Sequence, residues 1–77
     1  MSTGNTYKVV ELVGTSPEGI DRAIENAINR AGQKLRGIDW SEVKEIRGQV
    51  EEGRVAWYQV KVGIGFRVLE PKNLHKE

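Results

Sequence analysis

The chain contains no cysteine and only one histidine, so it offers little material for catalysis or metal binding. Without cysteine, neither a disulfide nor a thiolate metal site can stabilise the fold. The histidine, His75, lies in the polar C-terminal tail, and no serine is within sensible reach of it. Glu42 and Glu45 could form an acid–base pair, but Lys44 and Arg47 beside them indicate a solvated strand face instead. We therefore predict no catalytic residues, no metal ligands and no enzyme that acts through its own side chains.

Long apolar runs and a large net charge are also missing. No stretch approaches the length of a membrane span, and Met1–Thr6 lacks the apolar region of a signal peptide. We expect a soluble, cytoplasmic protein without membrane contact. Twelve basic and eleven acidic residues are interspersed along the chain and give a net charge of +1. This balance argues against nucleic acid as a partner, because proteins that bind it concentrate positive charge on one face.

The chain has 77 residues, which is enough for one domain but leaves only a thin hydrophobic core. We expect a single domain over 1–77, with an ordered core from about residue 5 to about residue 70 and polar, frayed termini. Small domains without disulfides commonly gain the missing burial by self-association. The sequence therefore predicts a homo-oligomer.

The first half of the chain predicts a strand followed by a helix. Tyr7–Val13 is rich in β-branched residues and ends at Gly14, which indicates a strand. The helix is expected to begin at Ser16 and Pro17, a capping residue and a residue suited to the first turn, and to end at Gly37. Its apolar stripe comprises Ile20, Ala23, Ile24, Ala27, Ile28, Ala31 and Leu35.

The end of the chain predicts a hairpin. Glu51–Arg54 is a turn with Gly53 where positive φ is needed, and Pro71 is expected to end the last strand. One face of that strand is apolar and comprises Ala56, Tyr58, Val60, Val62, Ile64, Phe66 and Val68. We expect the apolar stripe of the helix to cover this face at Tyr58, Val60, Val62 and Ile64. The opposite face carries Trp57, Gln59, Gly63 and Gly65. Glycine inside a strand often marks close approach by a ligand or a backbone, so this face is predicted to be a docking surface.

The stretch around Trp40 supports two interpretations. Val43, Ile46 and Val50 are spaced like one face of a helix, and Asp39 with Glu42 resembles a capping box. Against a helix stand these same β-branched residues and a glycine at position 48. A strand that contains a bulge also departs from strict alternation. Periodicity alone leaves both structures open.

Three segments of the sequence resemble the dodecins, small flavin-binding proteins that assemble into a hollow shell of twelve subunits. The segments are Tyr7–Ser16, Trp40–Val43 and Trp57–Val62, and they occur in the family's order. The resemblance implies an α+β fold with β-α-β-β order, in which a three-stranded antiparallel sheet wraps one helix. It makes Trp40–Val50 a long strand, and it implies a homododecamer.

The resemblance also implies a flavin site. Trp40 would stack on the ring of FMN or riboflavin, Gln59 would hydrogen-bond its polar edge, and Arg47 would meet the FMN phosphate. Taken singly, the same residues fit a core tryptophan, a solvated glutamine and a surface charge paired with Glu45 or Glu51. Some family members bind coenzyme A as a second phosphorylated ligand, and the corresponding basic residues here would be Lys8, Arg30, Lys34 and Arg67.

The function implied by the resemblance is storage or photoprotection of flavin without turnover. Trp57 is not assigned to the flavin stack, and we expect it at a subunit contact. Two other functions fit the residues alone. One is a structural or scaffolding homo-oligomer, and the other is a small β-sheet module that binds nucleic acid through exposed aromatics.

Overall fold

The computed structural model describes residues 5–68, and it contains one helix and three strands within that range. The elements are β1 (Tyr7–Ser16), α1 (Ile20–Gly32), β2 (Ile38–Glu51) and β3 (Arg54–Arg67). All pairings are antiparallel and the strand order is β1-β3-β2, which confirms the predicted fold class. The predictions for Pro71, His75 and the polar tail lie outside the described residues.

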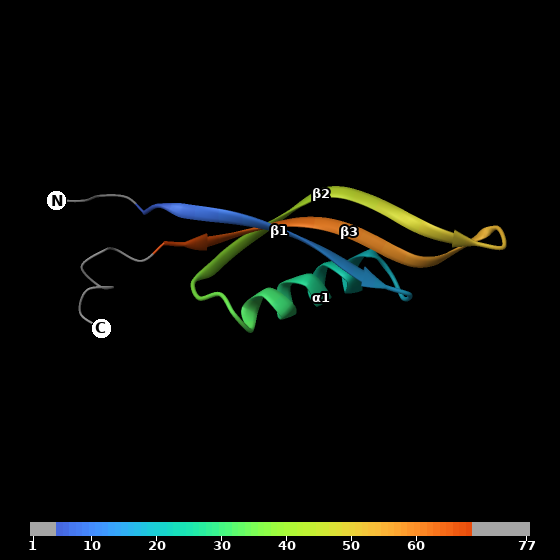
Figure 1. Ribbon diagram of the computed structural model, residues 1–77, viewed down its shortest axis with the longest axis horizontal. Helices are drawn as coiled ribbons and strands as arrows, with labels where there is room; N and C mark the ends of the chain where they lie inside the picture. Colours follow the sequence, from blue (N-terminus) through green and yellow to red (C-terminus); the bar gives the residue numbers. More distant parts are fainter. Residues whose placement is uncertain (1–4, 69–77) are drawn as a thin grey trace.

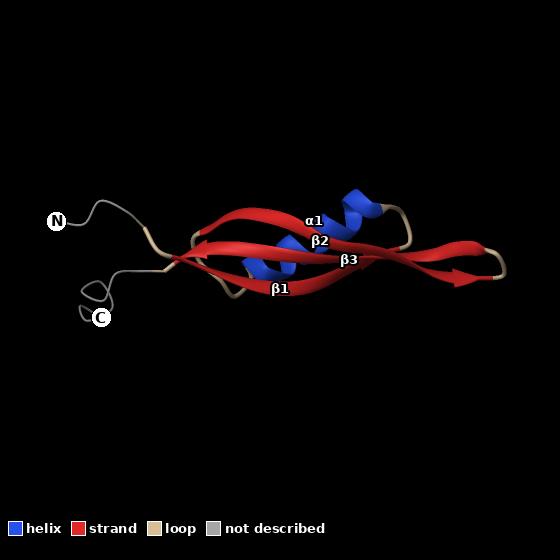
Figure 2. Cartoon of the chain, turned by 90° about the horizontal axis from the view of Figure 1, so that it is seen from above, coloured by secondary structure: helices blue, strands red, loops and turns tan. Residues whose placement is uncertain are grey.

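The core forms where α1 lies along one face of the sheet (Figure 1). Val60, Val62 and Ile64 of the central strand β3 are fully buried beneath the helix, as the alternation predicted. The helix turns toward them the small side chains of Ala23, Ala27 and Ala31, all of them buried. Small residues let the helix approach the sheet closely. Figure 2 shows the helix crossing beneath the three strands.

The predicted helix boundaries were wrong at both ends. β1 continues through Gly14 to Ser16, and Ser16 pairs with Tyr58 instead of capping the helix. The Ser16 hydroxyl accepts from the backbone N–H of Glu18 at 2.9 Å, which turns the chain, and α1 begins only at Ile20. The helix also ends at Gly32, well before Gly37.

Two glycines outside the helix therefore have roles that the sequence did not indicate. A Cβ atom on Gly14 would overlap the carbonyl oxygen of Ala23, so Gly14 permits the close packing of α1 on β1. Gly37, at φ 74°, redirects the chain into β2, and its carbonyl accepts from the N–H of Arg67 at 3.0 Å.

The stretch around Trp40 is a strand, and its helical spacing comes from bulges. Val43 lies opposite Val62 and Ile46 lies opposite Val60, so three residues of β2 span two residues of β3. The extra residue shifts the alternation by one position and keeps both side chains on the helix side of the sheet. The capping-box interpretation of Asp39 and Glu42 was therefore wrong.

The β2–β3 hairpin extends beyond the helix (Figure 1). Near its turn, Val50 and Val55 are 64% and 44% exposed. Gly53 has the positive φ predicted for the turn, 78°, and Glu52 also has positive φ, 53°; a type I′ turn has positive φ at both central residues. The helix packs mainly on β1 and β3, so Val43 and Ile46 of β2 remain 46% and 52% exposed. The radius of gyration is 16.1 Å, whereas a compact domain of this length would have roughly 11 Å. The single chain is elongated and incompletely packed.

Within residues 5–68, no helix has the length and apolar character needed to cross a membrane.

Candidate functional site

The face of the sheet that points away from α1, here called the outer face, carries the flavin-site residues expected from the sequence. By strand register it includes Tyr7, Val9, Glu11, Val13, Trp40, Glu42, Glu45, Arg47, Gln59, Lys61, Gly63, Gly65 and Arg67. No described element of the chain covers this face (Figure 2). Its aromatic end and its amide end lie far apart.

At the aromatic end, the indole of Trp40 lies flat on the backbone of Gly65. Trp40 is paired with Gly65, and a Cβ atom on that glycine would overlap carbon atoms of the indole. The Tyr7 ring lies beside it, with ring centres 4.9 Å apart and planes inclined by 54°. The side of the indole that faces away from Gly65 stays open, since Trp40 is 39% exposed. An open indole plane supported from behind can stack on another flat ring.

Tyr7 is itself held by a hydrogen bond. Its phenol O–H donates to Oδ2 of Asp39 at 2.9 Å. That hydrogen bond raises the pKa of Tyr7 above its ordinary value of 10.0, and partial burial and the Asp39 charge act in the same direction. Neither Tyr7 nor Asp39 was proposed as a site residue from the sequence. The signal that could have found Tyr7 was its place on the same side of β1 as Val9.

At the amide end, Gln59 and Arg47 are partners. They lie opposite each other in the β2–β3 ladder, and Nε of Arg47 donates to Oε1 of Gln59 at 3.0 Å. The alternative pairing of Arg47 with Glu45 or Glu51 is not formed, and Glu45 instead meets Lys61 at 3.7 Å. The bond uses the amide oxygen of Gln59 and leaves its NH₂ group free to donate. The remaining guanidinium nitrogens of Arg47 can bind an anion.

The two ends cannot serve one flavin ring within a single chain. Gly65, beneath Trp40, and Gln59 are six positions apart on β3, which corresponds to about 20 Å along a strand. This separation exceeds the length of an isoalloxazine ring. The structure thus brings Gln59 and Arg47 together but places Trp40 elsewhere on the same face.

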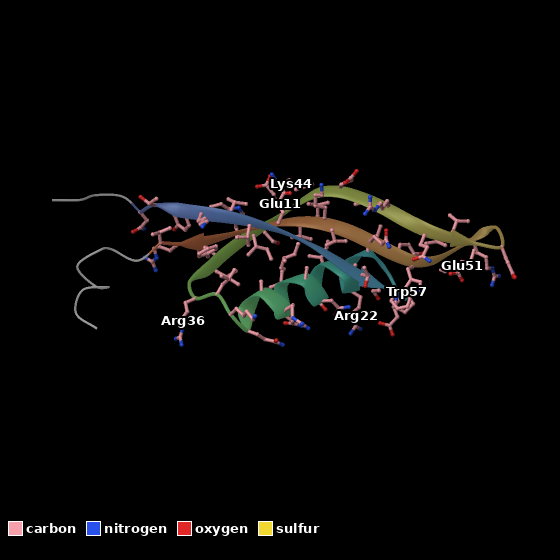
Figure 3. The ribbon with its side chains drawn as sticks, in the orientation of Figure 1. Glu11, Arg22, Arg36, Lys44, Glu51 and Trp57 are labelled. Atoms are coloured by element: carbon pink, nitrogen blue, oxygen red, sulfur yellow. The ribbon has the colours of Figure 1, made fainter. Side chains whose placement is uncertain are left out.

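Charged residues fill the space between the two ends. Lys44 lies 3.8 Å from Glu11 and 3.9 Å from Glu42, while Lys61 meets Glu45. Figure 3 shows Lys44 and Glu11 side by side above the sheet. These side chains are all well exposed, so each ion pair adds little stability. Each of the two glutamates considered for acid–base chemistry is paired with a lysine, as expected for a solvated face.

The two glycines of the outer face are each approached by a side chain of the same chain. The group that approaches Gly65 is the indole of Trp40. A Cβ atom on Gly63 would lie 2.9 Å from Cε of Lys44 and 3.4 Å from Cγ1 of Val9. Both glycines therefore make room for side chains from neighbouring strands of the same chain.

The four basic residues considered for a second ligand do not form one cluster. Arg30 and Lys34 line a shallow groove of about 350 Å³ between α1 and β1, together with Val10, Leu12, Ala31 and Leu35. Lys8 is paired with Phe66 at the far end of β1 and does not line the groove. Arg67 lies opposite Tyr7, on the other side of the sheet.

Trp57 lies toward the hairpin end of the molecule and is 41% exposed (Figure 3). Its partner in the ladder is Gln49, so it is well separated from Trp40. Among residues 5–68, no group of three or more His, Asp or Glu side chains is arranged to hold a metal ion.

Comparison with known proteins gives one consistent family. The Dodecin family model matches residues 6–69. A dodecin from Thermus thermophilus is 55% identical over 67 residues, which cover 87% of this chain and 97% of the relative. The solved dodecin of Streptomyces coelicolor superposes with a TM-score of 0.84 at 52% identity, covering 90% of this chain and 99% of that one. A protein named calcium dodecin from Mycobacterium tuberculosis is 28% identical over 83% of this chain and 90% of its own length.

Proposed function

Because this chain belongs to the dodecin family, we propose that it is a non-enzymatic protein that binds FMN or riboflavin and stores the flavin or protects it from light. The observation that carries the proposal is the indole of Trp40, which is seated on Gly65 with its other side open. An isoalloxazine ring is flat and largely apolar, so stacking on this surface contributes about 0.5–1.5 kcal/mol beyond the burial of area.

The proposed site requires more than one copy of the chain. Gln59 and Arg47 lie about 20 Å along the sheet from Trp40. In the proposed homododecamer, one copy contributes its indole, and another contributes the Gln59 amide for the polar edge of the ring and the Arg47 guanidinium for the FMN phosphate. Two symmetry-related Trp40 side chains would enclose a pair of flavins. The apolar side chains left open on β2, among them Val43 and Ile46, favour such an assembly.

The chemistry assigned to this chain is electron donation without turnover. Bound flavin supplies the absorption of light. The Trp40 indole would donate one electron to the excited ring, and return of that electron would restore both groups without net reaction. Gln59 and Arg47 contribute binding and orientation only. The family and the relatives named above carry no enzyme name, and residues 5–68 contain neither cysteine nor histidine.

Titration of the purified protein with riboflavin and FMN tests the proposal. The parent should quench flavin fluorescence strongly, and Trp40→Ala should lose both affinity and quenching because stacking plane and electron donor disappear together. Gln59→Ala should weaken binding by about 1–3 kcal/mol. The fluorescence of the flavin that still binds should remain quenched. Arg47→Ala should penalise FMN more than riboflavin, and the difference should shrink at high salt.

Trp57→Phe is the matched control, since it removes the other exposed indole, far from Trp40, but keeps an aromatic ring at that position. The proposal is wrong if Trp40→Ala binds flavin with the affinity of the parent and quenches its fluorescence to the same extent. A large, colourless oligomer that ignores both flavins would favour the scaffolding function instead. Binding of a single-stranded oligonucleotide in place of flavin would favour the nucleic-acid module.

For the second, phosphorylated ligand, the proposal is limited to two of the four basic residues. Arg30 and Lys34 at the mouth of an apolar groove fit a phosphorylated molecule such as coenzyme A, whereas Lys8 and Arg67 lie elsewhere. Competition between coenzyme A and inorganic phosphate for the Arg30→Ala variant and the parent would test it.

A further inference from the structure

A hydrogen bond joins the two outer strands of the sheet beside the proposed stacking surface. The phenol O–H of Tyr7 on β1 donates to Oδ2 of Asp39 on β2 at 2.9 Å. β1 and β2 do not pair with each other, because β3 lies between them. The Tyr7 side chain therefore reaches across the central strand, next to the indole of Trp40.

The ring of Tyr7 supports the indole without covering it. Tyr7 lies opposite Arg67, and Trp40 lies opposite Gly65, two positions away on β3. The ring centres are 4.9 Å apart and the planes are inclined by 54°, so the two rings make a tilted contact and not a stack. One side of the indole rests on Gly65, Tyr7 flanks it, and 39% of the residue remains exposed.

Asp39 adds a second constraint, on the backbone. Ile38 pairs with Phe66 and Trp40 pairs with Gly65, so Asp39 is an extra residue without an opposite partner on β3. Such a bulge sets the direction of the side chains next to it. By binding the Asp39 carboxylate, Tyr7 anchors the bulge that precedes Trp40.

We propose that Tyr7 and Asp39 are positioning residues that hold the indole of Trp40 flat on Gly65 in the free protein, which preorganises its open side for a flat aromatic ligand. The part concerning the ligand rests on the proposed flavin function, and the part concerning the free protein does not. Without this clamp the indole would sample several rotamers, and a ligand would have to order it on binding.

The test uses a Trp57→Phe background, in which Trp40 is the only indole because the chain has two tryptophans. Tyr7→Phe removes the hydroxyl, Tyr7→Leu removes the ring as well, and Asp39→Asn keeps an oxygen that can accept the bond. Tyr58→Phe is the matched control, since Tyr58 pairs with Ser16 and Gly48 at the other end of the sheet. Near-ultraviolet circular dichroism and fluorescence anisotropy report on the indole without flavin, and riboflavin titration reports on binding.

We expect Tyr7→Leu to abolish most of the indole dichroism, lower the anisotropy and weaken riboflavin binding about tenfold. Tyr7→Phe should weaken it about threefold, and Asp39→Asn and Tyr58→Phe should stay within about twofold of the parent. Unchanged dichroism and anisotropy in Tyr7→Leu would overturn the inference.

If Tyr7→Leu fails to assemble, Tyr7→Phe provides the test. Unchanged dichroism and anisotropy in that variant would equally show that Tyr7 and Asp39 do not hold the indole. If the parent binds no riboflavin, the proposed function fails, while the measurements without flavin still decide whether Tyr7 and Asp39 hold the indole.

Discussion

Replacing Gly65 by alanine should displace the indole of Trp40 and leave the fold intact. The added Cβ atom would overlap carbon atoms of the indole. β3 cannot retreat from this overlap, because β1 and β2 are hydrogen-bonded to it on both sides. The Trp40 side chain must therefore move away from residue 65.

The expected loss of stability is small and the expected loss of affinity is large. Overpacking of this kind costs about 1–3 kcal/mol, and the lower entropy of an unfolded chain with alanine in place of glycine offsets about 0.4–1 kcal/mol of that. The free energy of unfolding should therefore fall by at most about 2.6 kcal/mol. Riboflavin affinity should fall at least about tenfold, since the stacking surface is no longer flat or fixed.

Gly63→Ala is the matched control on the same strand and the same face. Its Cβ atom would meet chiefly Cε of Lys44, 2.9 Å away at the end of a flexible side chain that can move aside. Its riboflavin affinity should stay within about twofold of the parent. Urea unfolding at equal protomer concentration and riboflavin titration supply the two measurements. If Gly65→Ala has the same riboflavin affinity as Gly63→Ala and keeps the near-ultraviolet dichroism of the parent, the indole of Trp40 does not pack on Gly65.

Two further predictions concern the assembly and the effect of pH. Val43→Asp and Ile46→Asp each place a charge on the half-exposed apolar side chains of β2. Both variants should lower the mass measured by light scattering toward the 8.7 kDa of one chain, whereas Val13→Asp on the outer face should lower it less. If Val43→Asp and Ile46→Asp keep the mass of the parent, these side chains do not form an interface. Because the hydrogen bond to Asp39 raises the pKa of folded Tyr7 above its ordinary 10.0, the stability that the parent has over Tyr7→Phe should be complete below pH 10 and vanish as the pH rises through the folded pKa. Urea midpoints of both proteins across alkaline pH would check this, and a constant difference would contradict it.

Turn chemistry and alternation were sufficient to predict the hairpin and the buried face of the last strand. Gly53 at positive φ and the row of apolar residues through Val60, Val62 and Ile64 encode these features locally. The helix stripe was also correct in its alanines, because a period of 3.6 residues reports directly on one helix face. These features depend on residues close together in the chain, and a single sequence contains that information.

The second strand needed information from outside its own pattern. Its apolar residues have helical spacing because a bulge at Lys44 adds a residue, and a bulge exists only relative to the partner strand. The prediction of a strand here came from the resemblance to a family and not from local propensity. Likewise, Ser16 fits a cap in sequence but is used in a ladder pair with Tyr58, a residue 42 positions away.

The residues of the candidate site could be named from the sequence, but their arrangement could not. Trp40, Gln59 and Arg47 share one face, yet only register shows that Trp40 lies about 20 Å along the strand from the other two. Gly65 and Tyr7 acquire their roles from contacts across strands, so neither residue carries a local signature of it. Chain order determines which side chains are available, whereas strand pairing decides which of them touch, because each pairing joins residues that are distant in sequence.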